Sequence, residues 1–374
     1  MPQAASRITA VYRIRSDAAS IEARAQAIAV EQSVEMPVAA IADRSVLDGI
    51  VGRVDGIAEL HSGGGDGLFE VRIALAAATT GLEAGQLMNM LFGNTSLHDD
   101  VVLHDVLFPE AVAAAFGGPN HGLEGLRARA GAAGRAMTCT ALKPQGLPPA
   151  ALAGLAGRFA RGGLDFVKDD HGLADQAYSP FAERVPACAD AVRAANAATG
   201  GRTRYVPSLS GDLDALRRQV AIARDAGVDT VLVAPMVVGL PAFRALVREA
   251  ADMAVLAHPA LGGAARIALP LLFGRLFRLF GADATIFPNH GGRFGYTAET
   301  CRALADAARA PWGDLRPCVP VPAGGMALDR VGEMLDGYGA DTMLLIGGSL
   351  LAAGDRLVDA AAAFTTSVCN HVYR

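Results

Sequence analysis

The stretch Gly162–His171 (GGLDFVKDDH) joins a buried apolar strand to four consecutive ionisable residues. Alternate residues of a strand point the same way, so Lys168 and Asp170 share one face. A charge run of this kind is usually a solvated surface segment. The segments on either side indicate otherwise, because they place this strand in a regular series whose carboxyl ends collect polar residues.

The series starts after about residue 138, where short apolar runs alternate with longer helical stretches. Strand starts recur every ~25–40 residues, which is the spacing of βα units in a parallel barrel. We expect eight strands: Cys139–Pro144, Asp165–Asp170, Arg204–Leu209, Thr230–Pro235, Ala254–Pro259, Ala284–Asn289, Cys318–Ala323 and Thr342–Gly347. Their apolar runs are typical of strands buried on both faces, and eight consecutive units favour closure over an open sheet.

The first third of the chain has a different pattern. Strands are predicted at Ile8–Arg15, Gly52–Leu60, Leu68–Ala76 and Val101–Phe108, helices at Ser20–Gln32 and Gly85–Leu91, and a flexible hairpin loop at Ser62–Gly67. The sequence therefore predicts an α/β protein. An α+β, ferredoxin-like domain (residues 1–137) precedes a C-terminal (β/α)8 TIM barrel (residues 138–374).

Composition excludes several classes of protein. The 374 residues are 52% hydrophobic and 19% charged with a net charge of -5, so no nucleic-acid surface is expected. The five cysteines lack the close spacing of a metal or redox pair and indicate reduced thiols. The first residues lack the apolar core of a signal peptide, and the most apolar window, Ile267–Gly281, is too short to span a bilayer. We expect a cytoplasmic protein without membrane contact.

Active sites of barrels form where the strands end, and the strand ends here carry ionisable residues. Lys168 can pair with the carboxylate of Asp170, or it can react with CO2 to give a carbamate. A carbamate turns a cation into an oxygen ligand, and His171 then completes a three-ligand face for a metal. Glycine pairs follow the last two strands, at Gly324–Gly325 and Gly347–Gly348. Their backbone N–H groups can approach a phosphate closely.

These segments occur in the order found in the RuBisCO large-chain family, and the chain resembles its RuBisCO-like, form IV members. GGLDFVKDDH is similar to the activation motif, whose lysine is carbamylated and binds Mg²⁺ together with two acidic residues. The other similar segments are Phe92–Asn94, Gly117–Gly122, Cys139–Pro144, His258, Ala323–Gly325 and Ile346–Gly348.

The resemblance implies a role for each matching residue. Lys168, as its CO2 carbamate, Asp170 and His171 are expected to bind the metal. The catalytic residues that it implies are Lys143, Lys168, His258, Asn94 and Glu31. The substrate and its phosphate are expected to contact His290, Arg293, Gly324, Gly325, Gly347 and Gly348. It also implies a homodimer with shared active sites, in which Asn94 and Glu31 close the barrel of the other subunit.

Departures from the family pattern limit the function. The loop Asn289–Tyr296 has no lysine to stabilise the carboxylate formed from CO2, so a CO2-fixing RuBisCO is not expected. Pro259 replaces an arginine of one phosphate site, which implies a substrate with one phosphate. His171 replaces a glutamate ligand, so Mg²⁺ would be held more weakly and Mn²⁺ or another divalent ion is an alternative.

Three functions compete. The first is a lyase that decarboxylates, or hydrolytically cleaves, a 3-oxo sugar-acid phosphate such as 3-oxo-isoapionate 4-phosphate through an enediolate. The second is an isomerase or enolase of a (methylthio)ketopentose phosphate; Asn94 argues against the enolase group, because the resemblance implies a lysine at the matching position of that group. The third is a non-catalytic regulatory protein, against which the presence of Lys143, Lys168 and Asp170 argues. The sequence favours the first.

Overall fold

A computed structural model of the chain describes residues 6–61 and 67–373, so most of the expected hairpin loop Ser62–Gly67 lies outside the described residues. The chain divides into two compact units. The first comprises Met1–Gly117, Gly263–Leu272 and Trp312–Asp314; the second comprises Gly118–Gly262, Phe273–Pro311 and Leu315–Arg374.

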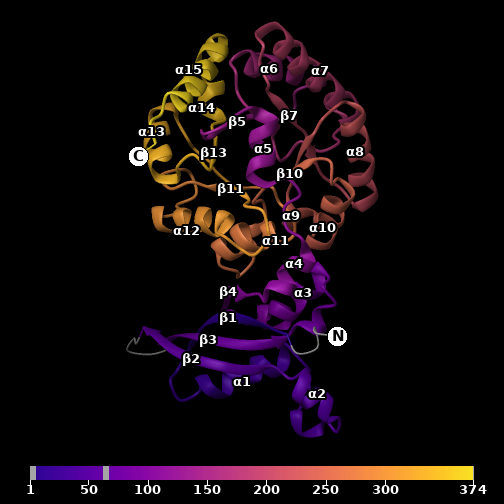
Figure 1. The fold of residues 1–374 in the computed structure, drawn as a ribbon, viewed down its shortest axis with the longest axis vertical. Coiled ribbons are helices and arrows are strands. Elements are labelled where there is room, and N and C mark those ends of the chain that lie inside the picture. Colours follow the sequence, from indigo (N-terminus) through magenta and orange to yellow (C-terminus); the bar gives the residue numbers. More distant parts are fainter. Residues whose placement is uncertain (1–5, 62–66, 374) are drawn as a thin grey trace. The chain divides into compact units, whose positions relative to one another are not determined.

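The first unit contains an antiparallel sheet in the order β2-β3-β1-β4 (Figure 1). Its elements are β1 (Arg7–Ser16), α1 (Ile21–Glu31), α2 (Arg44–Gly49), β2 (Arg53–His61), β3 (Gly67–Ala76), α3 (Ala84–Phe92), β4 (Val101–Leu107) and α4 (Glu110–Phe116). Alternate β1 residues are buried, and the Tyr12 hydroxyl donates to the carbonyl of Leu91 on α3 at 2.6 Å. The β-α-β-β-α-β succession and strand order confirm the expected ferredoxin-like α+β fold.

The second unit is a ring of parallel strands, as predicted. Its strands are β5 (Met137–Leu142), β6 (Phe166–Asp169), β7 (Arg204–Val206), β8 (Ser208–Leu209), β9 (Thr230–Val233), β10 (Ala254–Ala257), β11 (Ala284–Pro288), β12 (Val319–Ala323) and β13 (Met343–Leu345). Within the described chain every predicted strand is present. The third is split into β7 and β8 at Pro207, which cannot donate a ladder hydrogen bond.

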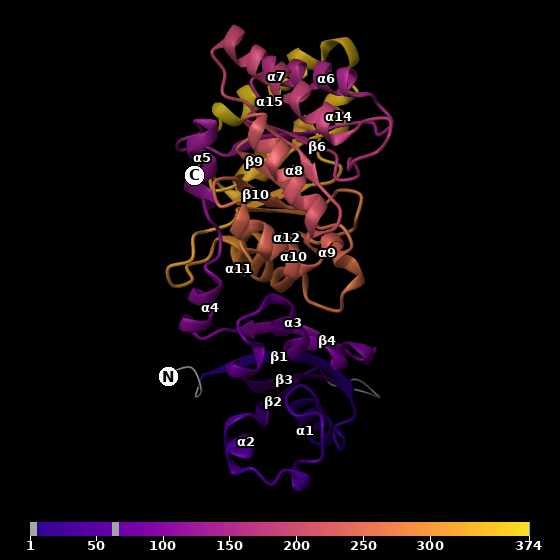
Figure 2. The same cartoon turned by 90° about the vertical axis from the view of Figure 1, so that its right-hand side faces the viewer.

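Two ladders make up the ring, β13-β5-β6-β7 and β8-β9-β10-β11-β12. β12 and β13 contact each other, and the Thr342 hydroxyl donates to the carbonyl of Pro320 at 2.9 Å. The ring is thus closed by side-chain and backbone contacts at this seam. Helices surround it (Figures 1 and 2). They are α6 (Pro149–Arg161), α7 (Phe181–Thr199), α8 (Leu213–Asp225), α9 (Pro235–Val238), α10 (Leu240–Glu249), α11 (Phe277–Leu279), α12 (Ala298–Arg309), α13 (Val331–Tyr338), α14 (Gly348–Leu351) and α15 (Leu357–Cys369).

Helix α5 (Gly122–Ala130) lies across the amino ends of the strands. Leu123 and Leu126 of α5 belong to the same buried cluster as the inward-facing strand residues. The carboxylate of Asp283, directly before β11, accepts from the backbone N–H groups of His121 (2.7 Å) and Gly122 (2.6 Å). The glycine-rich segment before the barrel therefore serves to dock α5 as the closure of the barrel base.

The most apolar window of the sequence is irregular in the structure. The apolar window Ile267–Gly281 forms a π-helix (Pro270–Leu276) followed by the short α11, rather than a single regular helix. In the described residues, no helix combines the length and apolar character needed to cross a membrane.

Candidate active site at the mouth of the barrel

The strand β6 sends its ionisable residues in opposite directions. Phe166 belongs to the core inside the ring, and Lys168 follows it on the same face at 3% exposure. Asp170 continues this alternation toward the mouth, whereas Asp169 faces away from the ring. The motif thus presents Lys168 and Asp170 to the barrel mouth, whereas the role of Asp169, which lies between them, becomes visible only in the structure.

Asp169 anchors the strand to its surroundings. It is fully buried, and its carboxylate accepts from Arg184 on α7 (3.1 Å), from the Tyr205 hydroxyl (2.8 Å) and from the Ser208 N–H (3.1 Å). Arg184 also donates to the carbonyls of Ser179 and Ala174, at 2.6 and 2.7 Å. Arg184 thus holds the loop that follows the motif. In the sequence, the only indication of this role is that Arg184 is an arginine at a buried position of helix α7.

Asp170 is held by groups from the segments that follow β5 and β6. Lys143 forms an ion pair with its carboxylate, the Gly172 N–H donates to it at 3.0 Å, and Gln145 lies at 3.5 Å. Burial alone would raise the pKa of Asp170, but the hydrogen bonds from Lys143 and Gly172 and the charge of Lys168 outweigh it and lower the pKa well below its usual range. Asp170 is therefore ionised at neutral pH.

Lys168 is the buried amine of the site. Its Nζ donates to the carbonyl of Asp169 at 3.0 Å. Burial lowers the pKa of Lys168, and the charge of Lys143 acts in the same direction. Both effects favour the neutral amine, the form that can attack CO2. Lys143 and Lys168 are also the only lysines among 33 basic residues, a signal in the sequence that the motif argument had not used.

Two histidines stack at the mouth. The rings of His171 and His258 are 4.0 Å apart between centroids and nearly parallel, at 9°. Nδ1 of His171 lies 3.4 Å from Asp170, and the Ala260 N–H donates to Nδ1 of His258 at 3.1 Å. Burial and then the charge of Lys168 lower the pKa of His258 to about 2; burial also lowers the pKa of His171. Both rings are neutral at neutral pH.

These protonation states fit a divalent ion. Metal ligands must be deprotonated, and here Asp170 is ionised, His171 is neutral and Lys168 is biased toward the amine that forms a carbamate. In the described residues no cluster of three or more His, Cys, Asp or Glu side chains is placed to hold a metal. The expected set contains two such residues, so it depends on a carbamate at Lys168 for its third ligand.

The expected phosphate site is built from three loops. The loop after β11 packs on the loop after β12: the Arg293 N–H donates to the carbonyl of Gly324 at 3.2 Å, and a Cβ on Gly292 would lie 2.1 Å from that carbonyl oxygen. The Ser349 hydroxyl on α14 donates to the carbonyl of Met326 at 3.1 Å. The glycine pairs after β12 and β13 are therefore joined, with Arg293 beside Gly325.

His290 is oriented toward α13. Its Nε2 lies 3.0 Å from Glu333, and Arg330 donates to the His290 carbonyl at 2.9 Å and to Glu333. The structure thus gives His290 a carboxylate partner that sequence reasoning had missed. Arg330 is a second cation next to the β11 loop, where the sequence had offered only Arg293.

Glu31 and Asn94 lie together in the first unit. The Asn94 amide donates to Glu31 at 2.8 Å and to Glu35 at 3.2 Å, although the three residues come from two separate segments. Glu31 and Asn94 line a cavity of about 470 Å³ together with the exposed Leu97. The sequence had named Glu31 and Asn94 but not Glu35.

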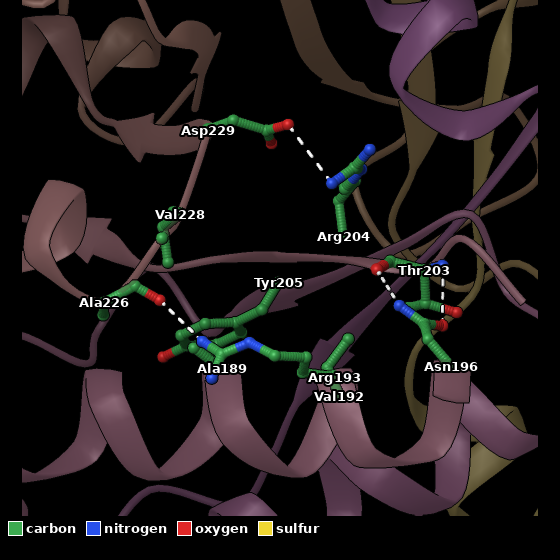
Figure 3. Close-up of a pocket in the computed structure, with 11 residues that line it drawn as sticks. Ala189, Val192, Arg193, Asn196, Thr203, Arg204, Tyr205, Ala226, Val228 and Asp229 are labelled. Carbon is green, nitrogen blue, oxygen red and sulfur yellow. Dashed lines mark hydrogen bonds and ion pairs between the residues drawn. The ribbon is translucent and has the colours of Figure 1, made fainter. Parts of the chain in front are cut away.

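Another cavity, which is in the barrel unit and has a volume of about 100 Å³, lies beside the amino ends of β7 and β9 (Figure 3). Its polar groups are satisfied by the protein. Arg193 donates to the Ala226 carbonyl at 2.9 Å, Asn196 donates to the Thr203 carbonyl at 2.9 Å, and Arg204 pairs with Asp229 at 3.4 Å. Nothing in it converges on a ligand, so the mouth remains the candidate site.

Comparison with known proteins agrees with this fold. The family model for the ribulose bisphosphate carboxylase large chain, catalytic domain, matches residues 122–369. The chain is 61% identical to a 5-methylthioribulose-1-phosphate isomerase of Rhodospirillum rubrum and 58% identical to ribulose bisphosphate carboxylase-like protein 1 of Rhodopseudomonas palustris, with 98% of each chain covered. The crystal structure of a Rubisco-like protein from Rhodopseudomonas palustris superposes with a TM-score of 0.91 at 56% identity over 99% of both chains.

Proposed function

Since this chain belongs to the RuBisCO large-chain family as a RuBisCO-like protein, we propose that it isomerises 5-methylthioribulose 1-phosphate. The observation that carries the proposal is the 61% identity, over 98% of both chains, to a protein named for that activity. This supports the isomerase alternative better than the decarboxylase that the sequence alone had favoured. The substrate carries one phosphate, in keeping with Pro259 at the end of β10.

The reaction needs proton transfers only. An isomerase of a ketose phosphate removes a proton from the carbon next to the carbonyl, passes through an enediolate, and returns a proton to the neighbouring carbon. No CO2 is captured or released. The absence of a lysine from Asn289–Tyr296 therefore does not impair this reaction.

The residues at the mouth supply the parts. Lys168 as carbamate, Asp170 and His171 would hold the divalent ion, which polarises the substrate carbonyl when bound. Lys143, which is half-exposed at the end of β5 and paired with Asp170, would carry the transferred proton. His258 is neutral and can hydrogen-bond a substrate oxygen.

The phosphate would bind at the joined glycine pairs. The N–H groups of Gly324, Gly325, Gly347 and Gly348 approach it, and Arg293 adds charge. A crystal soaked with sulfate should show anion density between these pairs. Density confined to the opposite side, near Pro259, would contradict this part of the proposal.

The homodimer with shared sites remains part of the proposal. Asn94 and Glu31 would close the mouth of a second copy and exclude water from the enediolate. Mixing inactive Asn94→Ala and Lys168→Ala subunits tests this, because shared sites leave one site of each heterodimer free of both lesions. Absence of recovered activity despite subunit exchange would mean that each site is built within one chain.

The activity is tested with purified protein, Mg²⁺ or Mn²⁺, and 5-methylthioribulose 1-phosphate in D2O. Proton and phosphorus NMR should show a rearranged ketose phosphate that has acquired deuterium at the carbons between which protons move. Lys168→Arg keeps the positive charge but cannot form a carbamate, so it should give no product. Release of CO2 from phosphorylated 3-oxo sugar acids, without turnover of the methylthio substrate, would restore the decarboxylase hypothesis.

The carbamate has a direct readout. The chain has only two lysines, so few amines can contribute a carbamate signal to a ¹³C NMR spectrum recorded under ¹³CO2. We expect one lysine carbamate signal, retained in Lys143→Arg and lost in Lys168→Arg. Retention of the signal in Lys168→Arg would place the carbamate elsewhere.

A further inference from the structure

An exposed leucine next to the active-site histidine has a backbone conformation that leucine rarely adopts. Leu261 has φ +65° and is 62% exposed. It is the third residue of a turn closed by a hydrogen bond from the Gly262 N–H to the Pro259 carbonyl, 2.9 Å long. Glycine is the usual residue at the positive-φ position of such a turn. A strained and exposed leucine contributes nothing evident to folding, so its side chain calls for another explanation.

The turn is fixed to the site. Its second residue, Ala260, donates its N–H to Nδ1 of His258 at 3.1 Å, and the His258 ring stacks on His171. The position of Leu261 relative to the two histidines is therefore determined by bonded geometry and one hydrogen bond. Leu261 follows β10 by four residues, on the side of the barrel where the site opens.

A second exposed apolar side chain follows the neighbouring strand, at the same number of residues from its end. β9 and β10 are parallel neighbours, and their last residues, Val233 and Ala257, are paired. Val237 lies four residues beyond Val233, just as Leu261 lies four residues beyond Ala257. Val237 is 54% exposed on the short helix α9. Two exposed apolar side chains, Val237 and Leu261, therefore follow the carboxyl ends of adjacent strands, the ends at which the site opens.

Strand β9, which precedes Val237, lies across the ring from β13, which precedes one glycine pair of the expected phosphate site. In the described strand order, with the split strand β7/β8 counted once, four steps separate β9 from β13 in either direction around the barrel. Gly347 and Gly348 follow β13. A ligand anchored there by a phosphate and extended over Lys168 and His258 would place its far end near Val237 and Leu261. Neither of these two side chains carries a charge or a hydrogen-bonding group.

We propose that Val237 and Leu261 form an apolar subsite that receives the methylthio end of the substrate and sets the preference for a thioether over a hydroxyl or hydrogen at that carbon. The inference rests on the proposed isomerase function and deepens it. A small apolar pocket of this kind discriminates by the burial of one or two carbon-sized groups, which corresponds to about tenfold in kcat/KM.

The test compares two substrates and two side chains. 5-Deoxyribulose 1-phosphate is the same ketose phosphate without the methylthio group. Leu261→Gly removes the side chain and suits the positive φ, while Leu261→Asn keeps the size and tolerates that φ but is polar. Each variant should lower kcat/KM about tenfold for 5-methylthioribulose 1-phosphate, mainly through KM, and less than about twofold for the 5-deoxy analogue. Val237→Ser should act in the same direction.

The control is Val372→Ser, which alters an exposed valine near the C-terminus and should leave both substrates unaffected. If wild type does not turn over the methylthio substrate, the proposed function fails. If wild type is active and the Leu261 variants lower kcat/KM equally for both substrates, or for neither, the subsite is wrong. Equal loss together with a changed sedimentation mass would assign Leu261 to a contact between copies of the chain.

Discussion

The two ends of the barrel use buried carboxylates in opposite ways. At the base, Asp283 accepts hydrogen bonds from three backbone N–H groups. Asp165 accepts from both terminal guanidinium nitrogens of Arg135, each at 2.7 Å. At the mouth, Asp170 is paired with the side-chain cation of Lys143 and accepts from the Gly172 N–H, and His171 next to it stacks on His258. The carboxylates at the base hold the fold, whereas the carboxylate that is paired with a lysine at the mouth is available for chemistry.

The largest expected effect is on activity at the mouth. Lys168→Met should lower kcat/KM by about 10²–10⁴-fold, the range that a lost proton-transfer or charge-stabilising group costs. The free energy of unfolding should stay within about 1 kcal/mol of wild type, because Lys168 makes no buried ion pair that holds other elements. Urea denaturation and the isomerase assay measure the two quantities. A large loss of stability would show that Lys168 is needed for folding, and the difference between the mouth and the base of the barrel would then not hold.

The opposite result is expected at the base. Asp283→Ala leaves the N–H groups of His121, Gly122 and Val255 buried without an acceptor. We expect the free energy of unfolding to fall by about 3–5 kcal/mol, since each buried unsatisfied donor costs about 1–3 kcal/mol. The kcat/KM of the folded fraction should be unchanged. A fall in kcat/KM with an unchanged free energy of unfolding would show that the base of the barrel also affects the active site at the mouth.

Asp169 lies between these cases and sharpens the comparison. Its neighbour Asp170 faces the mouth, while Asp169 is bound by Arg184, Tyr205 and Ser208. Asp169→Asn should lower the free energy of unfolding by about 3–5 kcal/mol, because Arg184 loses its buried counter-charge. Activity should fall less than about tenfold. The matched change Asp170→Asn should reverse the pattern; equal behaviour of the two variants would contradict the assignment of the faces.

The smallest effect expected is on metal preference. His171→Glu adds a carboxylate oxygen in place of a ring nitrogen, and oxygen ligands favour Mg²⁺ over softer divalent ions. The ratio of activity with Mg²⁺ to activity with Mn²⁺ should rise several-fold, with little change in stability at this half-exposed position. An unchanged ratio would show that His171 is not a ligand.

The sequence predicted the elements well because burial leaves a regular pattern. The apolar runs of the barrel strands and the alternation in β1 are local consequences of which faces are covered. α5 was not predicted, because its Gly-rich start lacks a strong helix signal and is held by a long-range bond to Asp283. Its function as the closure of the base follows from residues more than 150 positions away.

By itself, the sequence determined the family, the two-domain fold, and the strand ends at which chemistry collects, because motif order and burial periodicity are written along the chain. It also contained, in its two lysines, a marker of the site. Only the tertiary structure decided that Asp169 is a scaffold residue and Asp170 a site residue, and that His171 stacks on His258. Only the structure, too, showed Leu261 in a strained conformation. These are properties of side chains brought together from separate strands, and spacing along one strand cannot contain them.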